Sequence, residues 1–301
     1  MRIYSFDEIL KGALSRRDVI LTIGVFDGFH LGHQSLIRKM MEKKSEHPGA
    51  EAVLITFSVN PKTEFPRNVD TLRLREENAE KWGVDSFVII DFSSDFSKTS
   101  ACGFVEMLSS SFNPVAVVVG EDFRFGSSSS SASAYDLDSL FSSCGRKVDV
   151  TIMQSILTKG GEKISSTLVR RVIENGDVEC ISALTGRSYR VDLMPIPHRF
   201  DSGALVLPPS SIQQLLPPPG VYGASLEFGN GHRIDTSALL STSEVRIRAE
   251  NGPLERMAGE EEGVDSIYFL EKKKWYQVKR KSRSSRSSAV TRRTQATQRC
   301  R

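Results

Sequence analysis

The sequence predicts an α/β fold: a Rossmann-like, doubly wound parallel sheet followed by a small, mostly β domain. Short apolar runs alternate with helical patterns through the first 185 residues. Several of these runs are continuous and rich in β-branched residues, such as Val115–Val119, which suits strands buried on both faces of a parallel sheet. After Val191 the prolines become frequent and only short β-like pieces follow, which predicts the second domain.

The elements of the first domain follow in a regular order. Strands are expected at Val19–Val25, Ala52–Phe57, Ser86–Ile90, Val115–Val119 and Val148–Ile152. The helical patterns between and after them lie at Leu31–Lys44, Leu74–Trp82, Gly103–Ser110, Ala134–Cys144, Thr167–Glu174 and Val178–Leu184. The β-like pieces of the second domain are Gly220–Phe228, Ser243–Ala249 and Ser266–Phe269. We therefore expect a first domain at 1–187, a small β-rich domain at 188–278 and a tail at 279–301.

Composition and charge narrow the class of protein. With 39% hydrophobic and 26% charged residues, the chain is typical of globular proteins, and no apolar run approaches the roughly 20 residues of a membrane span. The four cysteines are scattered without a C-x-x-C pair, which argues against a zinc site or a disulfide framework and suits the cytoplasm. The net charge of +3 conceals a division, because residues 272–301 hold twelve Lys and Arg and no acid. We expect a disordered, solvated basic tail on a mildly acidic body, and we disfavour nucleic acid as its partner.

The most informative motif follows the first strand of this pattern. Gly24 to His33 places glycines and two histidines, His30 and His33, between the strand and a helix that begins near Leu31. Glycines let a backbone approach a polyphosphate, and the first turn of a helix offers unpaired N–H groups and a positive dipole end. Two imidazoles on one face of the helix start could both donate to phosphate oxygens. The segment also follows the carboxyl end of a strand, where ligands bind in doubly wound folds.

Two further polar segments could carry chemistry. Ser165, Ser166, Thr167 and Arg170 lie at a helix start, where hydroxyls are often N-caps but where a guanidinium one turn later adds a second anion clamp. The segment Val119–Gly126 follows the best buried strand; its Asp122, Phe123, Arg124 and Phe125 could pack around an ion pair or form a platform for a planar ring. P-loop, dinucleotide and serine-hydrolase signatures are absent.

In this order, the motifs resemble the bacterial FAD synthetase family, whose members are usually bifunctional riboflavin kinase/FMN adenylyltransferases. The family pattern G-x-F-D-G-x-H-x-G-H-x-x-L matches Gly24–Leu36, V-G-x-D-F-x-F-G matches Val119–Gly126, and I-S-S-T-x-x-R matches Ile164–Arg170. The similarity spans residues 19–190. The histidine and I-S-S-T-x-x-R motifs recur in the wider HxGH-type nucleotidyltransferases, whereas the D-F-R-F-G block narrows the resemblance to the flavin branch.

The resemblance implies AMP transfer from ATP to FMN, with Mg²⁺ bound mainly through the ATP phosphates. It implies His30, His33 and Arg170 as catalytic residues, and a flavin-side cleft that includes Phe57, Asn60 and Asp122–Phe125. The residues expected to bind ATP are Gly24, Phe26, Asp27, Gly32, Ser165, Ser166 and Thr167.

Two departures from the family bear on function. The family's T-F-x-P-H-P reads Thr56-Phe57-Ser58-Val59-Asn60-Pro61, so one proline and the histidine are lost. The sequence therefore does not define the flavin or nucleotide contacts of this segment. No match to the kinase motif P-T-A-N occurs between Val191 and Gly220, although Pro218–Tyr222 resembles the family's P-x-G-V-Y strand. We therefore expect a degenerate riboflavin-kinase barrel without kinase activity. The alternatives are a diverged kinase site, a nucleotidyltransferase for another phosphorylated acceptor (pantetheine phosphate, nicotinamide mononucleotide or glycerol phosphate), and a non-catalytic flavin-binding protein.

Overall fold

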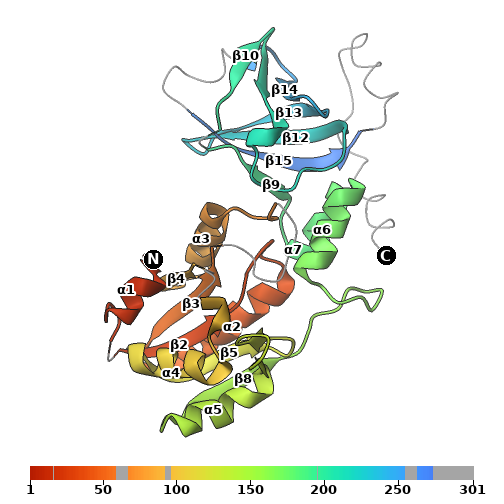
Figure 1. Ribbon diagram of the computed structural model, residues 1–301. Coiled ribbons are helices and arrows are strands. Elements are labelled where there is room, and N and C mark those ends of the chain that lie inside the picture. Colours follow the sequence, from red (N-terminus) through yellow and green to blue (C-terminus); the bar gives the residue numbers. More distant parts are fainter. Residues whose placement is uncertain (16, 59–66, 92–95, 195, 255–262, 274–301) are drawn as a thin grey trace. The chain divides into compact units, whose positions relative to one another are not determined.

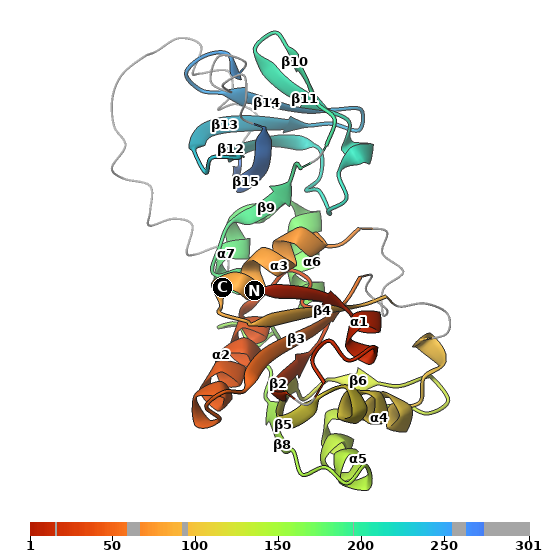
Figure 2. The ribbon, with the colours of Figure 1, turned by 90° about the vertical axis from the view of Figure 1, so that its left-hand side faces the viewer.

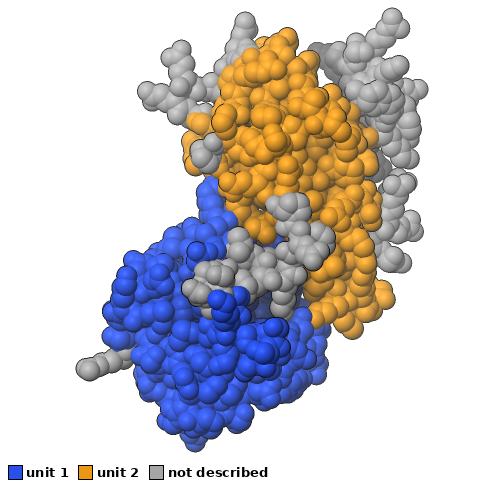
Figure 3. All heavy atoms as spheres, viewed as in Figure 1, with its two compact units in different colours: residues 1–65, 72–156 blue, residues 66–71, 157–301 orange. Residues whose placement is uncertain are grey.

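The chain divides into two compact units, which Figure 3 colours separately. This computed structural model describes all residues except 16, 59–66, 92–95, 195, 255–262 and 274–301. Unit 1 comprises residues 1–65 and 72–156, and unit 2 comprises residues 66–71 and 157–301. Asn60 and the expected basic tail lie outside the described residues.

Unit 1 contains the expected doubly wound parallel sheet. Its six strands follow the order β1-β4-β3-β2-β5-β8, and all of its pairings are parallel. β3 and β4 extend the sheet on one side of β2, and β5 and β8 extend it on the other, so the topological switch point lies between β2 and β5. The strands are β1 (Arg2–Ser5), β2 (Asp18–Ile23), β3 (Glu51–Phe57), β4 (Ser86–Ile90), β5 (Asn113–Gly120) and β8 (Asp149–Met153).

Helices cover both faces of this sheet, as Figure 2 shows. The helices of unit 1 are α1 (Phe6–Leu10), α2 (Leu31–Glu46), α3 (Leu72–Lys81), α4 (Ala101–Ser111) and α5 (Leu137–Ser143), with short 3₁₀ turns at Phe96–Lys98 and Ala134–Asp136. Side chains alternate across each strand: Val19 and Leu21 of β2 join the core that packs with α1, α4 and α5, whereas Ile20 joins the core under α2 and α3. This two-sided burial explains why the strands read as continuous apolar runs.

Unit 2 contains the expected β-rich domain. Its seven-stranded antiparallel sheet has the order β10-β11-β14-β13-β12-β15-β9. The helical elements that the contacts group with it are α6 (Ser166–Asn175), η3 (Val178–Cys180), α7 (Ile181–Thr185) and η4 (Pro209–Ser211). The strands are β9 (Tyr189–Asp192), β10 (Arg199–Asp201), β11 (Ala204–Leu207), β12 (Gly220–Phe228), β13 (Arg233–Leu240), β14 (Val245–Ala249) and β15 (Val264–Lys272).

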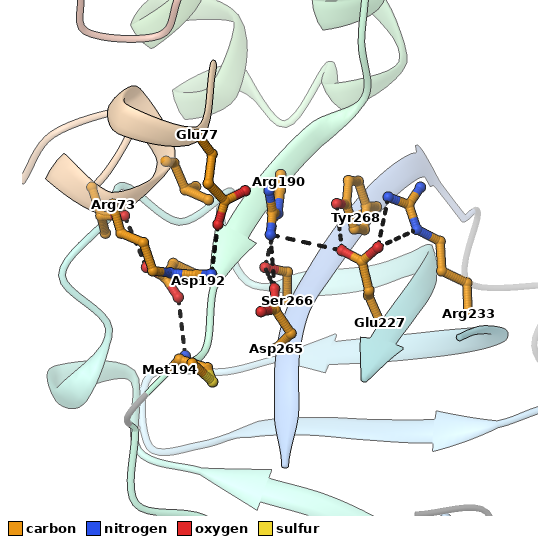
Figure 4. Close-up of polar contacts among 12 residues, drawn as sticks. Arg73, Glu77, Arg190, Asp192, Met194, Glu227, Arg233, Asp265, Ser266 and Tyr268 are labelled. Carbon is orange, nitrogen blue, oxygen red and sulfur yellow. Dashed lines mark hydrogen bonds and ion pairs between the residues drawn. The ribbon is translucent and has the colours of Figure 1, made fainter. Parts of the chain in front are cut away.

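A polar network on the sheet of unit 2 joins strands that are distant in sequence (Figure 4). Arg190 of β9 donates to Ser266 Oγ at 2.9 Å and to Asp265 at 2.7 Å, both on β15. Glu227 of β12 accepts a hydrogen bond of 2.6 Å from the Tyr268 hydroxyl and pairs with Arg190 at 3.7 Å. Because its charges are mutually paired and half-buried, we interpret this network as a structural link between β9, β12 and β15.

Several elements were not predicted from the sequence. They are β1, α1, β9, β10, β11, β13 and the small antiparallel pair β6 (Arg124–Phe125) and β7 (Ala132–Ser133). The division between the compact units falls at residue 156, whereas the sequence suggests a domain end at 187, because the contacts group α6, η3 and α7 with the antiparallel sheet.

Two further expectations concern the cysteines and the membrane. Cys102 and Cys144 are free thiols, and Cys180 is disulfide-bonded. The sequence argued against a disulfide framework, which one bonded cysteine does not contradict. None of the described helices is long and apolar enough to span a bilayer.

Gly126 provides a test of the close packing beside β6. Its φ is +86°, and a Cβ atom there would collide with the Ser130 carbonyl and lie 2.7 Å from the Ala101 amide nitrogen. These two backbone groups are hydrogen-bonded to each other at 3.0 Å. We expect Gly126→Ala to lower the free energy of unfolding by more than about 2 kcal/mol, measured by chemical denaturation.

Gly145→Ala is the matched control for this substitution. Gly145 also has a left-handed backbone (φ +69°), but nothing lies within 4 Å of its added Cβ. In the control, the free energy of unfolding should fall by only about 1 kcal/mol, which is the cost of a left-handed backbone at a residue with a Cβ atom. Equal losses for the two variants would show that the packing beside β6 imposes no special constraint.

Candidate functional site

The candidate site of unit 1 begins at the turn that connects β2 to α2. The Gly24 amide donates to the Ile55 carbonyl at 3.1 Å, which ties the start of the turn to β3. Gly28 has φ +78°, but Phe26 (φ +53°) and Phe29 (φ +37°) also adopt left-handed conformations that non-glycine residues rarely populate. The turn is therefore strained, and its position beyond β2 lies at the switch point of the sheet.

His30 and His33 lie side by side at the start of α2, as the sequence predicted. His30 is the N-cap residue, and its Nδ1 accepts a hydrogen bond from the His33 backbone amide at 3.4 Å. The two rings are stacked, with centroids 3.7 Å apart and planes inclined by 21°. Since Nδ1 of His30 acts as an acceptor, the neutral ring carries its proton on Nε2 and can donate from there.

The environment of His33 favours its neutral form. Burial lowers the pKa of His33 well below its ordinary value, and the charges of His30 and Arg75 lower it further. The His33 Nδ1 atom is buried and has no hydrogen-bond partner within the part of the chain that the structure describes. The Phe26 ring lies 5.0 Å from the His33 ring, so an aromatic wall completes the apolar surroundings. At neutral pH, His33 can thus offer one N–H group and no full positive charge.

The other predicted residues of this turn are mainly buried. Phe26 and Asp27 are completely inaccessible to solvent, and Phe26 packs in the core under α2 and α3. Gly24 and Gly32 are half-buried. The geometry gives Phe26 a packing role beneath the histidines, and the expected ATP contacts of these four residues stay predictions.

The second predicted clamp lies at the N-terminus of α6, in unit 2. The Ser165 hydroxyl caps the helix by accepting from the Leu168 amide at 3.2 Å, so the capping interpretation is correct for this residue. Ser166 is half-buried and Thr167 is exposed. Arg170 is 5% exposed and donates from Nη1 to the Arg67 carbonyl at 2.8 Å, so its guanidinium is anchored to the backbone.

The D-F-R-F-G block forms a packed turn after β5. Phe125 is buried and stacks on Phe123, with ring centroids 5.2 Å apart and an angle of 18° between the planes. Asp122 and Arg124 are exposed. Phe57, at the end of β3, is half-buried and packs edge-on against Phe96. The aromatic residues of the proposed flavin side thus serve packing at least in part, and their contact with flavin stays a prediction.

The sequence interpretation did not consider Arg75 and gave the Thr56 side chain no role. Arg75 is fully buried on α3, and its Nη1 donates to the carbonyls of Val25 and Phe57. The Thr56 hydroxyl donates to the same Val25 carbonyl at 2.9 Å. A signal was present for Arg75, since it lies four residues before Ala79 on the apolar side of a predicted helix.

A doubly wound parallel sheet with an H-x-G-H turn at its switch point places the chain in the nucleotidyltransferase class. The particular family is FAD synthetase: the chain belongs to it, and the match covers residues 13–168. The matched region contains the histidine turn, the D-F-R-F-G block and the start of α6.

Curated relatives that match this chain are named as FAD synthetases or as bifunctional riboflavin kinase/FMN adenylyltransferases. A "Bifunctional riboflavin kinase/FMN adenylyltransferase" from Buchnera aphidicola (subsp. Schizaphis graminum) is 34% identical over 114 residues, which is 36% of this chain and 36% of the relative. An "FAD synthetase" from Listeria monocytogenes is 33% identical over 116 residues, 36% of this chain and 46% of the relative. The chain therefore matches less than half the length of these two relatives.

One solved structure shares the fold over most of the chain. It is described as a macrolide-efflux protein from Streptococcus pneumoniae, with a TM-score of 0.72 and 22% sequence identity, and the match covers 91% of this chain and 100% of that chain. At this identity the similarity concerns the fold alone.

The lowered pKa of His33 predicts how stability depends on pH. The unfolded chain binds a proton near the ordinary histidine pKa of about 6.5, whereas folded His33 does so only at lower pH. Between these values the unfolded state binds more protons, so stability falls as pH decreases, by at most about 1.4 kcal/mol per pH unit. We expect calorimetry from pH 7.5 to 5.5 to show a shallower loss of stability for His33→Gln than for the wild type.

The control for this measurement is His47→Gln, at the other end of the same helix. His47 is the C-cap residue of α2 and is partly exposed. We expect this variant to follow the wild-type pH dependence. A His33→Gln variant with the same pH dependence as the wild type would contradict the assigned environment of His33.

Proposed function

We propose that this chain is an FMN adenylyltransferase, which transfers AMP from ATP to FMN to give FAD and pyrophosphate. Membership of the FAD synthetase family supports this activity. The observation that carries it is the stacked pair of His30 and His33 at the start of α2. In nucleotidyl transfer, the protein mainly positions the reactants and stabilises charge, and a pair of preorganised N–H donors suits that task.

The proposed reaction is an in-line displacement at the α-phosphorus of ATP. An oxygen of the FMN 5′-phosphate forms the new bond to this phosphorus, the bond to the β-phosphate bridging oxygen breaks, and pyrophosphate leaves with that electron pair. His30 would donate from Nε2, and His33 would donate its single N–H to the phosphoryl oxygens as their negative charge grows. Because the rings and the turn are already held in place, little reorganisation is needed.

We further propose that the α6 group acts on the same triphosphate. Ser166, Thr167 and the backbone amides of the first turn would bind the β- and γ-phosphates, with Ser165 holding the helix start and Arg170 adding positive charge. Mg²⁺ would enter with ATP and neutralise phosphate charge. Among the described residues, no three His, Cys, Asp or Glu side chains are grouped to hold a metal, so we assign the ion no protein ligands.

We propose that riboflavin kinase activity is lost. The stretch from Val191 to Gly220 lacks the P-T-A-N motif. Glu244, a carboxylate that lines the cavity of unit 2, accepts a hydrogen bond of 2.9 Å from Arg246. Hydrogen bonding to Arg246 lowers the pKa of Glu244, which makes this carboxylate a weaker base for a riboflavin hydroxyl.

One observation favours the alternative of a diverged kinase site. Unit 2 contains a cavity of about 400 Å³, large enough for a small ligand. Its lining residues are Pro197, His198, Arg199, Val206, Leu207, Pro208, Ser243 and Glu244.

The test uses the full chain with ATP, Mg²⁺ and one acceptor at a time, with products resolved by chromatography. With FMN we expect FAD and an equal amount of pyrophosphate; with riboflavin we expect neither FMN nor FAD. FMN formed from riboflavin would establish a kinase. Flavin binding without pyrophosphate release would indicate a binding protein, and turnover of another phosphorylated acceptor in place of FMN would assign a different transferase.

His33→Ala is the control for catalysis in this assay. Removing one positioned donor should reduce FAD turnover by about 10²–10³-fold. The circular dichroism spectrum should stay that of the wild type, because His33 is not a main part of the sheet core. Near-normal turnover in this variant would contradict the proposed mechanism.

A further inference from the structure

Unit 1 buries a cation outside the groups assigned to catalysis. Arg75 of α3 is 0% exposed and is among the largest fully buried side chains of the chain. Removing a guanidinium from water costs several kcal/mol unless its N–H groups are well paired. Such a residue at the C-terminal edge of a parallel sheet calls for a specific role.

The hydrogen bonds of Arg75 join two strand ends. Its Nη1 donates to the Val25 carbonyl at 3.2 Å and to the Phe57 carbonyl at 3.1 Å. Val25 lies just beyond β2, and Phe57 is the last residue of β3. The Val25 carbonyl also accepts from the Thr56 hydroxyl at 2.9 Å, so both of its lone pairs are used.

The Val25 carbonyl belongs to the peptide unit that precedes the strained part of the turn. Phe26, with φ +53°, follows directly, and Phe29 has φ +37°. Each such conformation costs on the order of 1–3 kcal/mol and persists only where the surroundings fix it. By fixing the Val25 peptide, Arg75 and Thr56 oppose relaxation of the turn, and the Phe26 ring in turn contacts His33 at 5.0 Å.

The charge of Arg75 reaches the same histidine by a second route. It is one of the causes that lower the pKa of His33, after burial and after the charge of His30. Arg75 therefore influences both the place and the protonation of His33.

We propose that Arg75 is a positioning residue for nucleotidyl transfer: its guanidinium clamps the ends of β2 and β3 and so holds the strained turn that presents His30 and His33. This inference rests on the proposed function of the same site. Because Arg75 is fully buried, it acts through the turn and not by touching ATP or FMN.

The test compares Arg75→Met, Arg75→Lys and Thr56→Val with a matched control, Arg146→Met. Arg146 also bonds to the protein interior, since it donates to the Asn113 side chain and to the Ser109 carbonyl, both at 2.8 Å. Asn113 begins β5, so Arg146 bonds at the amino ends of the parallel strands, whereas the histidine turn follows the carboxyl end of β2. kcat and the KM for ATP are measured below the unfolding transition of each variant, with folding checked by circular dichroism.

We expect Arg75→Met to lower kcat by about 10–100-fold, because small misplacement of reacting groups is costly. The kcat of Arg75→Lys should lie between that of Arg75→Met and that of the wild type. By the same reasoning, Thr56→Val should lower kcat by about 3–10-fold. The kcat of Arg146→Met should stay within about twofold of the wild-type value. If Arg75→Met does not fold, the kcat values of Arg75→Lys and Thr56→Val test the proposal. Wild-type kcat in folded Arg75 and Thr56 variants, or an equal loss in Arg146→Met, would overturn the proposal.

A second readout separates this proposal from the proposed function. The ring signals of His30 and His33 are recorded by NMR without substrate in the wild type, Arg75→Lys and Arg146→Met. Shifted signals of both histidines in Arg75→Lys alone support positioning, even if the wild type forms no FAD. Unchanged histidine signals in Arg75→Lys would overturn the clamp, whatever the activity assay shows.

Discussion

The account depends on one strained connection, the turn from Gly24 to His30. A parallel strand must pass its chain to a helix at the switch point of the sheet, and here it does so with two phenylalanines in left-handed conformations. The strain is held by hydrogen bonds to the ends of β2 and β3, to which Ile55, Thr56 and Arg75 contribute. The result is a fixed pair of imidazoles, which a relaxed loop could not provide.

The electrostatic character of the site follows from that packing. Burial and neighbouring charge keep His33 neutral, and the N-cap hydrogen bond orients His30. A neutral His33 ring that donates one N–H can stabilise negative charge without burying a full cation beside Arg75.

Much of unit 1 could be predicted because its physical signals are local. Strands buried on both faces read as apolar runs, and the helix start at Leu31 follows glycines and a histidine cap. β1 was missed because a short strand with three exposed residues has no apolar pattern. β13 was missed because only one of its buried residues, Leu240, is large and apolar, whereas the others are Thr236 and Ala238. In unit 2, strand pairing between residues such as Arg190 and Tyr268 depends on long-range register, which no local pattern encodes.

The site shows the same limit. The histidine pair could be predicted from its motif, because both residues lie within one turn of a helix start. Arg75 could not be assigned a role, since its partners, Val25 and Phe57, are 50 and 18 residues away and contribute only backbone carbonyls. The sequence also could not show that Ser165 is used as a cap and that Arg170 is anchored to the Arg67 carbonyl.

The most direct test of the central claim is an NMR titration of the wild type with a non-hydrolysable ATP analogue and Mg²⁺. It follows the ring signals of His30 and His33 together with the Arg170 guanidinium signal. If both groups hold one triphosphate, all three signals shift with a single Kd and saturate together. Shifts confined to one group, or two separate dissociation constants, would contradict the account.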